Sequence, residues 1–156
     1  MLGKLEVSFN SPQCGWMSIG FDDGVTEFHT TTAHAPHELA LAELLRILTE
    51  LQDTSSPQSE YLLKWNRDPE AFDFHFVREA AVVTITIYQY PTDERKSAER
   101  ELVFSHTGEA VQVVAAFAAT FEQLYSDRVI DEFEYNWRQP FPLVEFEEFK
   151  GRIERG

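Results

Sequence analysis

Hydrophobic and polar residues alternate through residues 61–90 in three consecutive runs. In each run every second side chain is apolar, which is typical of an antiparallel strand with one buried face. The apolar sets are Tyr61, Leu63 and Trp65, then Phe72, Phe74 and Phe76, then Val83, Ile85 and Ile87. The pattern predicts three successive strands that share one core face.

The connections between these strands set their register. A four-residue loop at 67–70 places Trp65 opposite Phe72. The next turn, at 78–81, lacks the Gly or Asn that a two-residue hairpin turn favours, so a second four-residue loop is expected. It would pair Phe76 with Val83, Phe74 with Ile85 and Phe72 with Ile87. Both hairpins then keep their apolar residues on the same face.

Another hairpin is predicted within residues 16–32, after a first short strand that carries Leu5, Val7 and Phe9. The dipeptide Asp23-Gly24 is a favoured type I′ pair, so we expect a two-residue turn there. This turn would place Ile19 opposite Phe28 and keep apolar residues together.

Leucines and aromatic residues spaced by three and four predict two long amphipathic helices, at 36–52 and 108–125. A strand at 98–105 precedes the second helix, and Thr107 is its expected N-cap. Asp127 is expected to cap a third helix, and a short terminal helix follows the Pro-Phe-Pro break.

These elements predict an α+β fold with two layers. About seven mostly antiparallel strands form a sheet, in the order β-β-β-α-β-β-β-β-α-α-α, and the two long helices cover one face. At 156 residues, 43% of them hydrophobic, the chain is expected to form a single α+β domain over 1–156.

Acidic residues outnumber basic ones by 27 to 13, and the formal net charge is −14. Nucleic acids and anionic membranes bind basic surfaces, so neither is an expected partner. An acidic surface suits solubility or a basic protein partner. With one cysteine, Cys14, no disulfide can form within the chain, which favours the cytoplasm. Residues 1–10 lack the apolar run of a signal peptide, and no apolar stretch reaches about 20 residues.

Known catalytic and phosphate-binding motifs are absent from the sequence, which favours a non-enzymatic protein without a cofactor. The alternative is a small metal- or ligand-binding enzyme. His29, His34 and His37 fall within nine residues, and imidazole is a good zinc or iron ligand. Their spacing matches no established metal site, and an ordinary polar connection between strand and helix is the simpler explanation.

The polar face of the central strands is the predicted binding surface. If helices cover one side of the sheet, a polar and aromatic group stands on the other side. Its members are Lys64, Asp73, His75, Thr84, Thr86, Tyr88 and Tyr90. Such a face offers aromatic area and hydrogen bonds to a protein partner, or to a second copy in a homodimer. Asp73 and His75 could also form an orienting pair in an enzyme, whereas an ordinary solvated strand face has the same composition.

A second candidate surface is the acidic C-terminal region. Six carboxylates flank residues 137–141: Asp131, Glu132, Glu134, Glu145, Glu147 and Glu148. Packed helices turn such charges to solvent, and opposed charges also speed encounter with a basic protein.

The segment Tyr135-Asn136-Trp137-Arg138-Gln139-Pro140-Phe141-Pro142, followed by a short amphipathic helix, resembles the end of a group of small acidic bacterial proteins of uncharacterised function. The resemblance implies no catalytic residues. Some proteins of similar size and charge are immunity proteins that mask toxins. This analogy rests on size and charge and on no shared motif. The acidic charge, the missing catalytic motifs and the polar, aromatic sheet face predict a protein-binding module, with an immunity-type inhibitor of a basic partner as one form of it.

Overall fold

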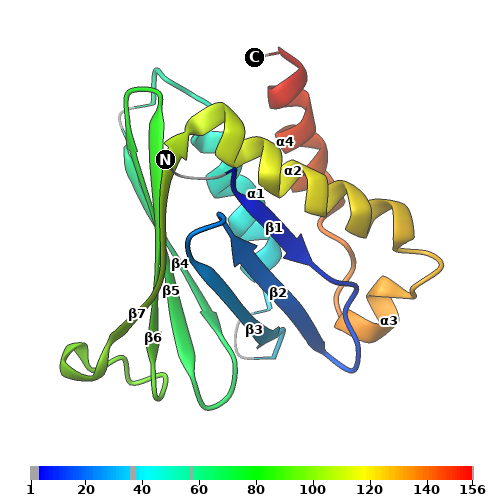
Figure 1. Cartoon of the computed structure of the whole chain (residues 1–156). Helices are drawn as coiled ribbons and strands as arrows, with labels where there is room; N and C mark the ends of the chain where they lie inside the picture. Colours follow the sequence, from blue (N-terminus) through cyan, green and yellow to red (C-terminus); the bar gives the residue numbers. More distant parts are fainter. Residues whose placement is uncertain (1–3, 36–37, 57, 156) are drawn as a thin grey trace.

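The structure is a computed structural model that describes residues 4–35, 38–56 and 58–155 (Figure 1). Its strands are β1 (Glu6–Phe9), β2 (Trp16–Asp22), β3 (Glu27–Ala33), β4 (Glu60–Asn66), β5 (Ala71–Glu79), β6 (Val82–Tyr90) and β7 (Glu101–Glu109). Its helices are α1 (Ala40–Glu50), α2 (Ala110–Asp127), α3 (Phe133–Trp137) and α4 (Leu143–Arg155), with a 3₁₀ turn, η1 (Ser97–Glu99). The α+β class and the order of elements are confirmed.

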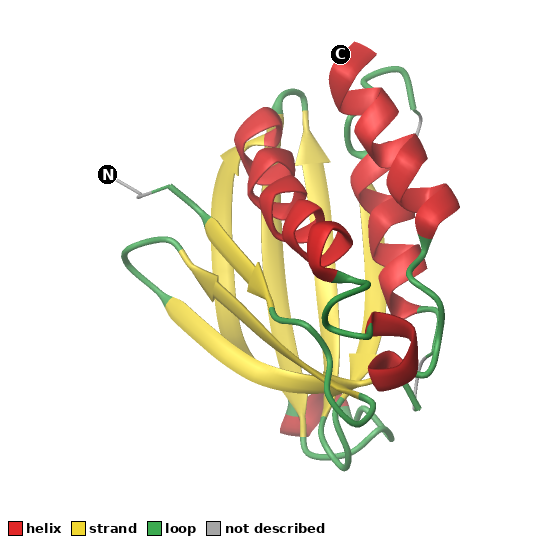
Figure 2. Cartoon of the chain, turned by 90° about the vertical axis from the view of Figure 1, so that its right-hand side faces the viewer, coloured by secondary structure: helices red, strands yellow, loops and turns green. Residues whose placement is uncertain are grey.

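The strands divide into two antiparallel sheets, β1-β2-β3 and β4-β5-β6-β7. Figures 1 and 2 show the helices and the three-stranded sheet on one side of the four-stranded sheet. Aromatic side chains fill the space between them. Phe21 of β2 is buried with its ring 5.9 Å from Phe74, 5.5 Å from Phe104 and 6.0 Å from Phe117. One ring thus contacts both sheets and α2, so the two layers share one core.

The predicted register of β4 and β5 is confirmed, because Trp65 pairs with Phe72 and Leu63 with Phe74. The predicted register of β5 and β6 is wrong by two residues. Glu79 pairs with Val82, so the turn has two residues and Phe76 faces Ile85.

The tight β5–β6 turn forms because Ala80 adopts a positive φ of 54°, which an alanine seldom does. Its neighbour Ala81 accepts a backbone hydrogen bond from Ala110 N at 2.8 Å. The hairpin tip is therefore joined to the start of α2, a tertiary contact that turn propensities do not report.

The predicted β2–β3 turn is wrong as well. Asp22 pairs with Glu27, so the loop has four residues, and Ile19 faces Thr30 in place of Phe28. The side chain of Asp23 organises this loop: its Oδ1 accepts hydrogen bonds from Val25 N at 2.9 Å and from Thr26 N at 2.8 Å. In a two-residue turn Val25 and Thr26 would belong to the following strand. In the four-residue loop they are loop residues, and the Asp23 carboxylate accepts hydrogen bonds from their backbone amides.

Thr107 is not the N-cap of the second long helix. It lies in β7, where it pairs with Thr84, and α2 begins at Ala110 after the extended Glu109. The helix then runs to Asp127, whose carboxylate accepts a hydrogen bond from Gln123 at 2.6 Å. Asp127 therefore ends α2 and does not cap α3.

Helix α2 packs on β1, and its Thr120 contacts the backbone of that strand. Phe9 N donates a hydrogen bond to Thr120 Oγ1 at 2.6 Å, and the hydroxyl lies 3.4 Å from Phe9 O. Both residues are buried. The threonine hydroxyl therefore satisfies the backbone amide of Phe9, which points to the outer edge of β1 where no neighbouring strand pairs with it.

Candidate functional site

The outer face of the four-stranded sheet carries the residues predicted to bind a partner. Register places Lys64, Asp73 and Tyr88 side by side in one row, and His75 beside Thr86 in the next. The helices and the three-stranded sheet lie on the opposite side (Figure 2). The strand pattern thus located these side chains correctly on one face, and their binding role stays a prediction.

The segment that joins β6 to β7 folds back onto one end of this face. Arg95 Nε lies 2.9 Å from Asp73 Oδ1, and its Nη2 donates to Asn66 Oδ1 at 2.7 Å. The hydroxyl of Tyr90 donates to Asp73 Oδ2 at 3.0 Å, and the guanidinium of Arg100 stacks 3.9 Å from the ring centre of Tyr88. Two arginines of the chain itself therefore occupy this end of the face.

Tyr90 is 5% exposed as a result, so it is not available to a partner in this conformation. Burial raises the pKa of the Tyr90 phenol, and the hydrogen bond to Asp73 and the charge of that carboxylate raise it further, against an opposing effect of Arg100. The pairing keeps the phenol protonated as a donor.

The remainder of the face is open. His75, Thr84 and Thr86 are partly exposed, and the Thr84 and Thr107 hydroxyls lie 2.9 Å apart. Two leucines flank them, Leu62 at 50% and Leu102 at 56% exposure.

The histidines of the alternative metal site are separated in the structure as far as it describes them. His29 on β3 pairs with Glu27, whereas the ring of His34 packs 5.8 Å from that of Trp137. His37 lies outside the described residues. In the described ranges no group of three His, Cys, Asp or Glu side chains is placed to hold a metal.

Sequence reasoning missed a buried hydrogen-bonded pair, Asp23 and His106. Asp23 Oδ2 lies 2.9 Å from His106 Nδ1, and the two side chains are 1% and 4% exposed. Burial raises the pKa of Asp23, but hydrogen bonds from Thr26 N, His106 and Val25 N outweigh it and hold the pKa below its ordinary value. Neither residue belongs to a known motif. Asp23 was also predicted to be one of the two central residues of a hairpin turn, so the pair could not be recognised from the sequence.

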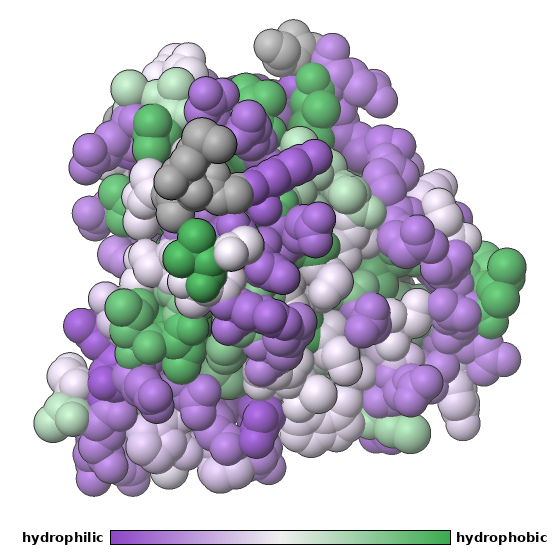
Figure 3. Space-filling model, in the orientation of Figure 1, coloured by the Kyte–Doolittle hydropathy of each residue, from purple (hydrophilic) through white to green (hydrophobic). Residues whose placement is uncertain are grey.

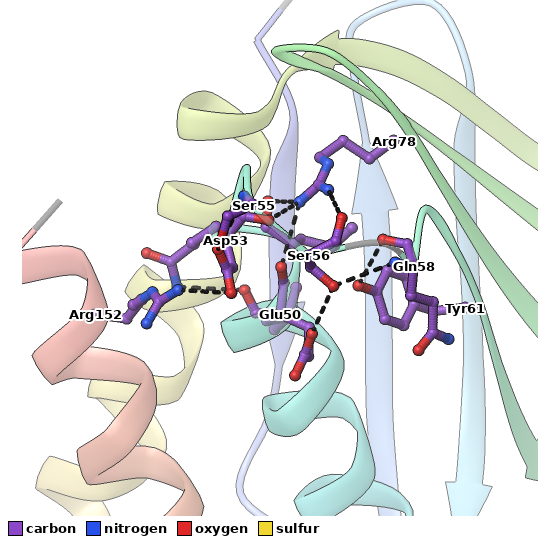
Figure 4. Close-up of polar contacts among 11 residues, drawn as sticks. Glu50, Asp53, Ser55, Ser56, Gln58, Tyr61, Arg78 and Arg152 are labelled. Carbon is purple, nitrogen blue, oxygen red and sulfur yellow. Dashed lines mark hydrogen bonds and ion pairs between the residues drawn. The ribbon is translucent and has the colours of Figure 1, made fainter.

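A second missed cluster surrounds Arg78, the residue that follows the buried phenylalanines of β5 on the core face. Its Nη1 donates to Asp53 O at 2.6 Å and lies 3.4 Å from the carbonyl oxygens of Glu50 and Leu51, and Nη2 lies 3.4 Å from Ser56 O (Figure 4). One guanidinium thus holds the end of α1 and the loop that follows it, where a cation also complements the helix dipole.

The acidic C-terminal region forms a surface around α3. A hollow of about 330 Å³ is lined by Arg128, Val129, Glu132, Phe133, Glu134, Tyr135, Phe141 and Leu143, and we name these residues, with Ile130 and Val144, the α3 surface. Val129, Ile130 and Tyr135 are 76%, 83% and 79% exposed. Figure 3 shows apolar atoms at the right-hand edge, over the segment after α2, with hydrophilic residues around them. The α3 surface thus combines exposed apolar and aromatic side chains with the neighbouring carboxylates of Glu132 and Glu134.

The chain matches no protein-family model, and no curated protein or solved structure is significantly similar to it. Among the residues that the structure describes, no helix has both the length and the apolar character needed to cross a bilayer. The geometry of the chain is therefore the basis for any functional proposal.

Proposed function

We propose that this protein is a non-enzymatic binding module for a basic protein, and that the α3 surface makes the contact. The observation that carries the proposal is the exposure of Val129, Ile130 and Tyr135 next to the carboxylates of Glu132 and Glu134. Large apolar side chains that project into water at one place are typical of interaction sites. Aromatic anchors inside a polar rim are typical of interface anatomy.

Charge defines the class of partner. The net charge of −14 attracts a basic protein over long range, and the acidic rim of the α3 surface orients it at short range. Lys or Arg side chains of the partner would pair with Glu132 and Glu134, while an apolar group would enter the hollow beside Tyr135. An immunity-type inhibitor, which covers the basic surface of its target, is one form of this function.

The test is affinity capture from a lysate of the source cells with three forms of the protein. The wild type should retain the same basic protein at low salt in each repeat and release it at high salt. The double variant Glu132→Lys/Glu134→Lys should lose it. The matched variant Asp93→Lys/Glu99→Lys changes the net charge equally at exposed positions of the β6–β7 segment, and it should retain the protein. Equal loss in both variants, or loss in the second alone, would contradict the assignment to the α3 surface.

A homodimer through the outer face of the four-stranded sheet is the second candidate, favoured by the exposure of Leu62 and Leu102 on that face. Light scattering after size-exclusion chromatography should then report a dimer that Leu102→Glu dissociates. A monomeric wild type, or a dimer unaffected by this change, would remove the candidate.

A further inference from the structure

An apolar groove of about 440 Å³ lies beside the first half of α2, away from the α3 surface. The α1–β4 loop, the β5–β6 turn and α4 form its other walls. Its apolar lining includes Leu51, Ala81, Val111, Val114, Ala118 and Ile153. Its volume is within the range of roughly 300–1,000 Å³ that is typical of small-molecule sites. Alanines on the turn and on α2 leave this space open.

Arg78 also lines the groove, and it is the group that defines the chemistry of a ligand. It is 7% exposed, so its positive charge is almost removed from water. Within the described ranges it forms no ion pair, and its hydrogen bonds go to uncharged carbonyl oxygens. A buried cation without a counterion is costly, and an anion at this position would relieve that cost.

The carboxylates of the neighbouring loop do not supply that anion. Asp53 offers Arg78 its carbonyl oxygen, while its carboxylate lies 3.2 Å from Arg152 Nη2. The carboxylate of Glu50 accepts a hydrogen bond from Ser56 Oγ at 3.3 Å (Figure 4). Both acids are thus engaged away from the guanidinium.

The start of α2 adds to the positive potential of the same groove. Ala110 and Val111 line it, and the first turn of the helix carries no acidic side chain. In the described chain Glu109, the N-cap residue, makes no side-chain capping bond, so no hydrogen bond from a carboxylate satisfies the first amides of the helix.

We propose that this groove binds a small carboxylic acid with an unbranched aliphatic chain. The carboxylate would lie against Arg78, at the polar wall, and the chain would lie along Val111, Val114 and Ala118 of α2. The guanidinium, whose described partners are all uncharged carbonyl oxygens, selects an anionic head, and the apolar walls select the tail. This inference does not depend on the proposed protein partner, because the groove and the α3 surface share no residue.

Calorimetric titration with three probes of equal chain length tests the choice of head group. Octanoate should bind at least about fivefold more tightly than octylamine or octanol, because a guanidinium attracts the carboxylate locally. The comparison is stringent, since the net charge of −14 attracts the amine to the protein as a whole and repels the carboxylate. Equal or tighter binding of octylamine or octanol would overturn the proposal, as would no binding of octanoate.

A pair of neighbouring substitutions tests the location. Val111→Asp places an acid on the groove wall, and Gln112→Asp places one on the next, exposed residue, which does not line the groove. Acids in the first turn favour helices, so both variants should fold. Val111→Asp should weaken octanoate binding at least about fivefold, and Gln112→Asp less than about twofold. In ¹⁵N NMR spectra, octanoate should shift the amides of Ala81, Val114 and Ala118. Equal effects of the two variants, or shifts confined to other regions, would contradict the site.

Discussion

Asp23 and His106 form a buried contact across 83 residues of sequence, with Oδ2 of the first 2.9 Å from Nδ1 of the second. Asp23 belongs to the loop of the three-stranded sheet, and His106 belongs to β7 of the four-stranded sheet. The pair therefore links the two sheets through a buried polar contact. A Cβ on Gly108 would come within 2.9 Å of His106 Nε2, so the glycine leaves room for the ring.

Replacing Asp23 with Asn should lower the free energy of unfolding by about 2 kcal/mol, because a buried charge-assisted hydrogen bond to His106 is lost. Urea denaturation at pH 7 measures the change. The control is Asp22→Asn: Asp22 lies next in the chain and accepts one hydrogen bond, from Gly24 N. An equal loss of stability in the two variants would show that the contact with His106 contributes little.

The stability that Asp23 contributes should depend on pH in a defined direction. Its pKa is lower in the folded protein than in the unfolded chain, so the folded state favours the charged carboxylate. The contribution is complete above the unfolded pKa of about 4 and is lost as the pH falls through the lower, folded value. Urea midpoints of the wild type and Asp23→Asn should therefore differ most at neutral pH and converge towards pH 2. A constant difference over that range would contradict the expectation.

Replacing Ala80 with Gly should stabilise the protein, because Ala80 adopts a φ of 54° at which a Cβ is unfavourable. The gain should be about 1 kcal/mol, or a rise in melting temperature of about 3 °C. Ala81→Gly is the matched change in the same turn, at a residue without positive φ, and it should not stabilise. If both variants shift the melting temperature alike, the effect does not come from the backbone of Ala80.

Tyr90 should ionise above the ordinary range of tyrosine, because burial and the carboxylate of Asp73 both disfavour the phenolate. Absorbance near 295 nm during alkaline titration follows the five tyrosines together. Tyr90→Phe should remove the absorbance change that develops above the ordinary range of tyrosine, whereas Tyr135→Phe, which replaces a highly exposed residue, should leave that component in place. Loss of an ordinary component on Tyr90→Phe would contradict the buried pairing with Asp73.

Alternation of apolar residues predicted which face of each strand is buried, and it did so even where the register was wrong. Both wrong registers differ from the observed ones by two residues, for example Phe76 opposite Ile85 in place of Val83. A shift of two keeps every side chain on its own face, so hydrophobicity cannot distinguish the alternatives. The deciding contacts are those of Asp23 with the amides of its own loop and with His106, and that of Ala81 with Ala110, which lies far along the sequence.

The candidate binding face shows a similar limit. Its members were predicted by parity, but the covering of Asp73 and Tyr90 by Arg95 was not. Sequence shows a charged segment between β6 and β7, and such segments are usually exposed. Arg95 returns to the sheet because Asp73 and Asn66, diagonal neighbours on the paired strands β5 and β4, offer it two oxygen acceptors at once.

The hydroxyl of Thr120 has a consequence for self-association. An uncovered strand at the edge of a sheet offers its amide and carbonyl groups to the strands of other molecules, which leads to aggregation. At Phe9 the amide is already bound by Thr120, and α2 lies across the edge of β1. Helix α2 and its Thr120 thereby protect this sheet edge in a protein rich in phenylalanine, and at Phe9 the three-stranded sheet has no free amide to offer a neighbouring chain.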